Sequence, residues 1–138
     1  MSKPHILSAR STKRLEGVHR DLAKIVYSAS LITSIPFIVL EGIRTLEQQQ
    51  KLYKLGATRT LRSRHLTGHA VDLGAWINNT IRWDWPLYYK IAEAMQAAAE
   101  ASNISLEWGG NWVTFRDGPH FQLPWDKYPT PASLPAQD

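Results

Sequence analysis

Residues 63–73, SRHLTGHAVDL, place two histidines and an aspartate close together, and these residue types bind metals. Two imidazoles four residues apart share one face of a helix, and zinc peptidases of the HExxH type use such a pair with a glutamate directly after the first histidine. Here Leu66 stands in place of that glutamate, and Gly68 precedes the β-rich sequence AVDL. The sequence therefore argues against His65 and His69 as a helical metal pair.

His65 and Asp72 form the stronger pair. Side chains alternate between the two faces of an extended strand, so His69 is expected to point away from Asp72. His65 lies in the preceding loop and can approach Asp72 across the turn that Gly68 permits. Zinc accepts imidazole nitrogen and carboxylate oxygen, and a catalytic zinc site has three protein ligands with a fourth position open. A third ligand must come from another part of the chain.

His120 is the remaining histidine best placed to complete the set. His5 lies at the terminus and His19 on the polar side of an expected helix, so both are interpreted as surface residues. Asp117 precedes His120 by three residues, and the Gly-Pro turn between them can bring both groups to one side. A carboxylate there can act as general base toward a metal-bound water. Glu107, beside a Trp-Gly-Gly segment, is a rival base that is interpreted as an outer or surface carboxylate.

A set of helices and short strands must position these residues. Hydrophobic spacing, a capping box and a proline at a helix start predict three helices, over residues 12–30, 45–56 and 86–102. Short β-rich runs predict five strands, over residues 36–43, 69–76, 80–83, 104–108 and 120–123. Because the connections include short hairpins, we expect an α+β fold with a mainly antiparallel sheet packed by helices.

The length and composition fit one small domain. A chain of 138 residues can enclose a single hydrophobic core, which we expect over residues 1–123, before a proline-rich tail over 124–138 that is extended or disordered. Without cysteine the chain has no disulfide, thiolate ligand or thiol nucleophile. The N-terminus lacks the apolar stretch of a signal peptide, and no segment reaches the roughly 18 apolar residues of a membrane span. We expect folding in a cytoplasm.

The positive charge of the chain favours anionic partners. The net charge is +4 and the pI is about 9.5. Much of the excess lies in residues 1–24 and 59–65, and a solvated basic surface explains it equally well. No motif of a nucleic-acid-binding protein accompanies the charge, so nucleic acid is not expected as a partner.

Three motifs in order resemble the zinc peptidases that cut D-amino-acid-containing bonds of bacterial peptidoglycan. SRHLTGHAVDL fits the family signature S-x-H-x-x-G-x-A-x-D-L, EWGGNW with RDGPHF fits its C-terminal D/E-x-x-H element, and GIRTLEQQQKLY fits its arginine element. The family includes D-Ala-D-Ala carboxypeptidases and dipeptidases, and the chain looks most like its phage L-alanyl-D-glutamate endopeptidases, the endolysins. The resemblance implies the fold of D-Ala-D-Ala metallopeptidases and hedgehog-like domains, with residues 1–123 as the zinc peptidase domain.

The resemblance also implies roles for individual residues. The residues that match the zinc ligands are His65, Asp72 and His120. Asp117 matches the catalytic carboxylate, and Arg44 matches the arginine that contacts the scissile carbonyl and its developing oxyanion. The matches expected to bind substrate are Ser63 and Gln49. A cation at a helix start is unfavourable for the helix dipole, which is an independent reason to expect a function for Arg44.

The expected function is zinc-dependent hydrolysis of the L-alanyl-D-glutamate bond of stem peptides during phage lysis. Two alternatives stay open. One is the same chemistry in a D-Ala-D-Ala carboxypeptidase or dipeptidase, and the other is a non-catalytic zinc-containing module that binds the wall, in which Asp117 and Arg44 have no role. We expect a monomer without stable membrane insertion, held in the host cytoplasm until a holin-type pore gives it access to the periplasm and the peptidoglycan.

Overall fold

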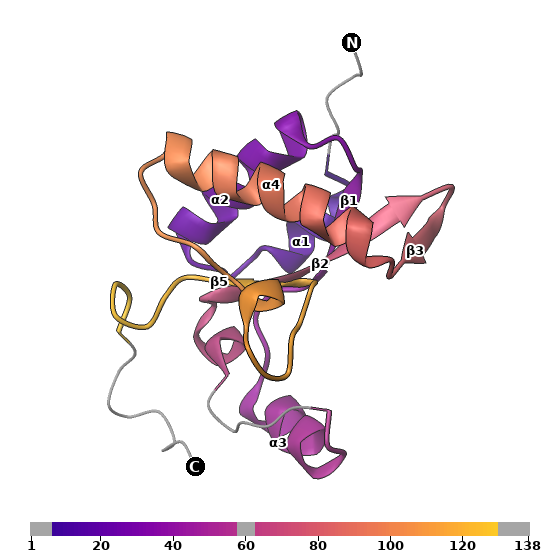
Figure 1. The fold of residues 1–138 in the computed structure, drawn as a ribbon. Coiled ribbons are helices and arrows are strands. Elements are labelled where there is room, and N and C mark those ends of the chain that lie inside the picture. Colours follow the sequence, from indigo (N-terminus) through magenta and orange to yellow (C-terminus); the bar gives the residue numbers. More distant parts are fainter. Residues whose placement is uncertain (1–6, 58–62, 130–138) are drawn as a thin grey trace.

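The computed structural model describes residues 7–57 and 63–129. Two helices, α2 (Arg20–Ile32) and α4 (Trp85–Ala101), pack side by side over one face of a sheet (Figure 1). The short helix α1 (Ala9–Arg14) packs against the first strand, and α3 (Leu46–Lys54) lies on the other side of the sheet (Figure 1). In the described ranges, no helix combines the length and the apolar character needed to cross a membrane.

The sheet has a central strand with partners on both sides. Its strands are β1 (Phe37–Glu41), β2 (Ala70–Ile77), β3 (Thr80–Arg82), β4 (Glu107–Trp108) and β5 (His120–Gln122). The order is β1-β2-β5-β4, and β3 pairs with β2 through an Asn78–Asn79 turn in which both residues have positive φ. Every pairing among the described residues is antiparallel, which confirms the expected α+β fold with a mainly antiparallel sheet.

Alternation along the strands gives the sheet an apolar face and a polar face. Val39, Leu73 and Phe121 are fully buried in the core beneath the two long helices. Their neighbours Asp72 and His120 therefore point to the opposite face. The helical layer stabilises the fold, and the other face is left for polar groups.

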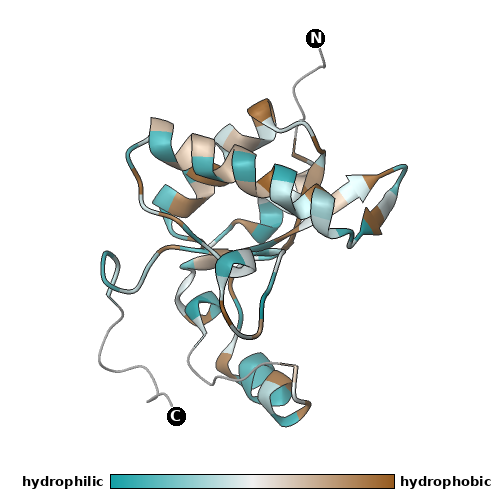
Figure 2. Cartoon of the chain, in the orientation of Figure 1, coloured by the Kyte–Doolittle hydropathy of each residue, from teal (hydrophilic) through white to brown (hydrophobic). Residues whose placement is uncertain are grey.

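Helix α3 contributes little to the core. It begins with the expected capping box, in which Thr45 Oγ1 accepts from Gln48 N (3.1 Å) and Gln48 Oε1 accepts from Thr45 N (3.0 Å). The helix is mostly hydrophilic (Figure 2), and Gln49 is its one buried residue. Its role is to supply a polar contact to the other face of the sheet.

The single helix expected over residues 12–30 is wrong, because the chain turns between α1 and α2. Gly17 has a φ of +84°, which ends the helical path. His19 then caps α2 through its ring, with Nδ1 accepting a hydrogen bond from Asp21 N at 3.0 Å. Hydrophobic spacing continues through both helices and so conceals the break. The strand expected over 104–108 is likewise shorter, since only Glu107–Trp108 is paired.

Arg64 holds the segment after β5 against the domain. Its buried guanidinium donates to Leu123 O (3.0 Å) and Tyr128 O (2.7 Å), and it stacks on the Trp125 ring at 4.3 Å. Residues 125–127 form a turn, and residues 130–138 of the expected tail lie outside the described residues, as does His5. The charge of Arg64, one of the basic residues of the segment 59–65, is therefore buried and does not contribute to a solvated basic surface.

Candidate metal centre

The centre is built on a row of side chains across the polar face of the sheet. Asp72 on β2 and His120 on β5 are directly opposite each other in the antiparallel register. Side chains in such a pair start about 5 Å apart. His120 Nδ1 lies 3.2 Å from Asp72 Oδ1, so strand pairing alone joins two residues that are far apart in the chain.

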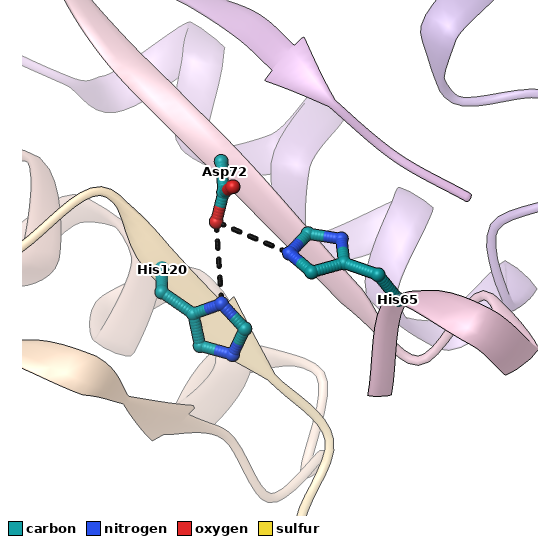
Figure 3. Close-up of side chains that lie close together, drawn as sticks. All are labelled: His65, Asp72 and His120. Carbon is teal, nitrogen blue, oxygen red and sulfur yellow. Dashed lines mark hydrogen bonds and ion pairs between the residues drawn. The ribbon is translucent and has the colours of Figure 1, made fainter. Parts of the chain in front are cut away.

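His65 reaches the same oxygen from the turn η1 (Arg64–Thr67). Ser63 caps this turn, with Oγ accepting from His65 N at 3.1 Å. Gly68 ends it with a φ of +76°, and a Cβ there would overlap the carbonyl oxygen of Gly17. His65 Nε2 lies 3.3 Å from Asp72 Oδ1, as the turn at Gly68 was expected to allow (Figure 3).

The three side chains fit a metal site. One ligand atom from each of His65, Asp72 and His120 lies within 4.8 Å of the others, and both imidazoles are buried. The outer nitrogen of each ring has an acceptor: Gly42 O is 2.7 Å from His65 Nδ1, and Gln122 Oε1 is 2.7 Å from His120 Nε2. Metal-ligating histidines in proteins are oriented by such outer hydrogen bonds. They leave Nε2 of His65 and Nδ1 of His120 facing the carboxylate.

The protonation of the centre reflects its burial and its partners. Burial would raise the pKa of Asp72, but hydrogen bonds from His120 and His65 outweigh it and hold this pKa well below its usual value. Burial would lower the pKa of His120, but the hydrogen bond to Asp72 and its negative charge raise it. Asp72 is therefore an anion between two imidazoles, the charge state in which a carboxylate binds a cation.

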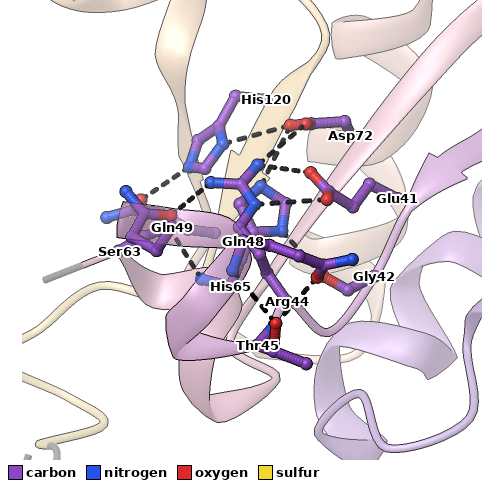
Figure 4. A network of polar contacts seen from close by, with 11 residues as sticks. Glu41, Gly42, Arg44, Thr45, Gln48, Gln49, Ser63, His65, Asp72 and His120 are labelled. Carbon is purple, nitrogen blue, oxygen red and sulfur yellow. Dashed lines mark hydrogen bonds and ion pairs between the residues drawn. The ribbon is translucent and has the colours of Figure 1, made fainter. Parts of the chain in front are cut away.

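Arg44 is held beside the centre by two side chains (Figure 4). Its Nε donates to Glu41 Oε2 at 3.2 Å and its Nη2 to Glu41 Oε1, while Nη1 donates to Gln49 Oε1 at 2.6 Å. Nη2 also lies 4.0 Å from Asp72 Oδ2, and Arg44 N donates to His65 O at 2.9 Å. The guanidinium is thus fixed in orientation next to the predicted ligands.

Glu41 is a site residue that sequence reasoning missed. A β-bulge between Val39 and Glu41 shifts the register of β1, so that Glu41 lies opposite Asp72. In a regular strand Glu41 would share the core-facing side of Val39. The bulge turns it to the polar face, where it binds Arg44. Its position three residues before Arg44 was the available signal, but a bulge leaves no clear mark in a sequence.

Asp117 lies in the loop that leads into β5, near enough to the centre for the charges of its residues to act on the Asp117 carboxyl. Burial raises the pKa of its carboxyl, the negative charge of Asp72 raises it further, and the charges of His120, His65 and Arg44 partly oppose this. Glu107, the rival base, accepts a hydrogen bond from Trp112 Nε1 at 2.8 Å. The Trp112 ring lies 5.0 Å from that of His120, so Glu107 contacts the centre through this tryptophan.

The structure gives each of the other predicted residues a different set of contacts. Ser63 uses its hydroxyl to cap η1, and Gln49 has no exposed surface and contacts Arg44. His69 points away from Asp72, as expected, and packs against His19 and Tyr128. Gln122, which holds His120, was also missed. Its place two residues after His120 puts it on the same face of β5, and that alternation was the available signal.

The chain is similar to known proteins over most of its length. The chain is 36% identical over 123 residues to the L-alanyl-D-glutamate peptidase of Listeria phage A118, covering 89% of this chain and 43% of that protein. It is 29% identical over 106 residues to the L-alanyl-D-glutamate peptidase of Escherichia phage T5, covering 74% of this chain and 77% of that protein. The chain therefore spans less than half of the first relative and about three quarters of the second.

A solved structure gives the same fold. The crystal structure of the L-Ala D-Glu endopeptidase ChiX of Serratia marcescens matches with a TM-score of 0.87 and 45% sequence identity, covering 91% of this chain and 96% of that one. The sequence profile of the phage L-alanyl-D-glutamate peptidases matches residues 4–123. With most of its length matched, the chain belongs to the phage L-alanyl-D-glutamate peptidase family.

Proposed function

We propose that the protein is a zinc-dependent peptidoglycan endopeptidase that hydrolyses the L-alanyl-D-glutamate bond of stem peptides. The observation that carries this proposal is the convergence of His65, Asp72 and His120 within 4.8 Å, beside Asp117 and Arg44. The names of the family and of its relatives supply the bond, and the match over residues 4–123 supports residues 1–123 as the peptidase domain.

The donor set fits zinc better than a hard cation. Two imidazole nitrogens and one carboxylate oxygen are ligands that zinc prefers, whereas calcium and magnesium are bound by oxygen. Three protein ligands leave a fourth position for water or substrate. The acceptors Gly42 O and Gln122 Oε1 orient the rings as zinc sites in proteins require.

The residues around the ligands have complementary roles. A bound zinc ion supplies Lewis-acid polarisation of the scissile carbonyl and a lower pKa for the attacking water. Asp117 accepts a proton from that water and passes it to the leaving nitrogen, and its raised pKa suits a group that holds a proton briefly. Arg44, fixed by Glu41 and Gln49, donates to the carbonyl oxygen as negative charge develops there.

The biological setting belongs to the same proposal. The enzyme acts as a monomer on the host wall, remains in the host cytoplasm until lysis, and reaches the periplasm through a holin-type pore. Both phage relatives are L-alanyl-D-glutamate peptidases, which supports the wall as substrate.

Digestion of purified peptidoglycan, with mass spectrometry of the fragments, tests the function. We expect new N-terminal D-glutamate, abolished by a chelator and restored by added zinc. Release of D-alanine would instead indicate a D-Ala-D-Ala carboxypeptidase. Binding to the wall without any cleavage would indicate a non-catalytic module, and cleavage that resists chelation would remove the zinc mechanism.

A further inference from the structure

The loop that carries Asp117 is closed on itself by main-chain contacts. It leaves the turn η2 (Gly109–Asn111) and ends at β5, without regular structure between residues 112 and 119. Asp117 N donates to Gly109 O at 3.0 Å, and His120 N approaches Asp117 O at 3.3 Å. A Cβ on Gly109 would lie 2.5 Å from Asp117 O, so the two ends of the loop touch here. These contacts hold the main chain of Asp117 at the closed end of the loop.

Arg116 anchors the loop through its side chain, in addition to the hydrogen bond from Trp108 Nε1 to Gly118 O at 2.7 Å. The Nε of Arg116 donates to Gly110 O at 2.9 Å, which ties it to the start of the same loop. Its guanidinium lies 4.2 Å above the Trp85 ring, and its Nη2 donates to Tyr89 Oη at 3.1 Å. Trp85 and Tyr89 are one turn apart at the beginning of α4. One side chain thus joins the loop to a helix of the rigid core.

Arg116 does this without an ion pair. In the described part of the chain its guanidinium lies within ion-pair distance of no carboxylate. Its contacts need a planar fork that stacks on a ring and donates in two directions, and lysine does not offer this.

We propose that Arg116 is a positioning residue for Asp117. It fixes the loop on α4 so that the carboxylate faces the metal ligands. This inference rests on the proposed function, since it assigns Arg116 to the same reaction. Arg116 makes no contribution to metal binding, because the three predicted ligands lie on β2, β5 and η1 and not in the loop.

Kinetics of R116A, R116K and D117N on a stem peptide test the proposal. Misplacing a reacting group by about 1 Å lowers rates up to about a hundredfold, so we expect R116A to lower kcat tenfold to a hundredfold with KM nearly unchanged. R116K should restore little of this, and zinc affinity and Tm should stay close to wild type. In a D117N background R116A should cause no further loss, since it acts through that carboxylate.

R82A is the matched control, because Arg82 is an exposed arginine paired with Asp84 before the same helix. It should keep the wild-type kcat. Additive losses in the double variant, or a loss in zinc affinity equal to the loss in kcat, would overturn the proposal.

Amide hydrogen exchange separates this inference from the proposed function, because it needs no activity. R116A should speed exchange at the amides of Asp117 and of its loop while α4 stays protected. An unchanged exchange rate in the loop contradicts the positioning role even if the enzyme is active. If R116A exchanges faster but the wild-type protein has no peptidase activity, the anchoring role of Arg116 is supported and only the proposed function is refuted.

Discussion

Each histidine of the candidate metal centre has one ring nitrogen beside a protein acceptor. Gly42 O holds His65 through a main-chain atom that no substitution removes, but Gln122 Oε1 holds His120 through a side chain. Gln122 is buried, with 5% of its surface exposed. The orientation of His120 is therefore open to a direct test by substitution.

Gln122→Leu should weaken zinc binding about tenfold to a hundredfold, the usual effect of losing an outer hydrogen bond to a ligand. Competition with a chelating dye measures this without any need for activity. Gln50→Leu, an exposed glutamine on α3, is the control and should bind zinc like wild type. Equal zinc affinity in Gln122→Leu and wild type would show that the hydrogen bond does not orient the ligand.

Asp117→Asn and His120→Ala should separate catalysis from metal binding. Asp117→Asn is expected to keep stoichiometric zinc and to lose about 10²–10⁴-fold in kcat, because only the general base is removed. His120→Ala should lose both zinc and turnover, because a ligand is removed. Metal analysis and stem-peptide kinetics on the same samples give both values. Normal turnover of Asp117→Asn would return the base role to Glu107 or to another group.

At the scale of elements, short irregular segments place the functional groups. The turn η1 brings His65 next to Asp72 of β2, and the bulge in β1 turns Glu41 to the polar face. The loop that carries Asp117 returns to Gly109. These segments break the regular period of helix or strand that sequence analysis follows. Most helices and strands appear close to where their patterns predict them, apart from the break between α1 and α2 and the shorter β4.

Gly68→Ala should destabilise the turn that carries His65. An L residue at positive φ costs about 1–2 kcal/mol, and the added Cβ would also overlap Gly17 O, so we expect about 3 kcal/mol or more in total. Gly56→Ala is the control, since Gly56 has nearly the same φ (+74°) with nothing near its Cβ, and should lose only about 1–2 kcal/mol. Urea unfolding measures both, and equal losses would show that the Gly17 contact is unimportant.

At the scale of the molecule, the fold separates stability from chemistry. The helices α2 and α4 cover the apolar face of the sheet (Figure 1), and the side chains of the candidate centre lie on the other face. A second cluster, formed by His19, His69 and Tyr128, joins α2 to the segment after β5. Its histidines influence the stability of the whole domain.

Acidification should reduce the free energy of unfolding partly through His69. Burial, the charge of Arg64 and that of His19 lower the pKa of His69 from 6.5 to about 4. Between these pH values the unfolded chain binds a proton that the folded chain refuses, so stability falls as pH falls through this window. After allowance for solvent screening we expect an effect on the order of 1 kcal/mol. His69→Gln should reduce the slope of stability against pH from 6.5 to 4, measured by urea unfolding with chelator present. A slope equal to that of wild type would contradict the assignment.

Sequence patterns were sufficient to predict the features of the protein that depend on nearby residues. Strand alternation separated His69 from Asp72, the capping box located the start of α3, and the turn at Gly68 paired His65 with Asp72. Family resemblance then assigned His120, Asp117 and Arg44; the structure places His120 and Arg44 beside the Asp72 carboxylate, whose charge also acts on Asp117. These features could be predicted because strand alternation, helix capping and turns depend on residues close together in the sequence.

The groups that hold the predicted residues in place are visible only in the folded chain. Glu41 and Gln49 bind Arg44, Gln122 binds His120, and Arg116 binds α4 through Trp85 and Tyr89. These contacts depend on a bulge, on strand register and on the packing of a loop against a helix. Each results from the summed free energy of many distant contacts, and no local pattern of residues encodes such a sum.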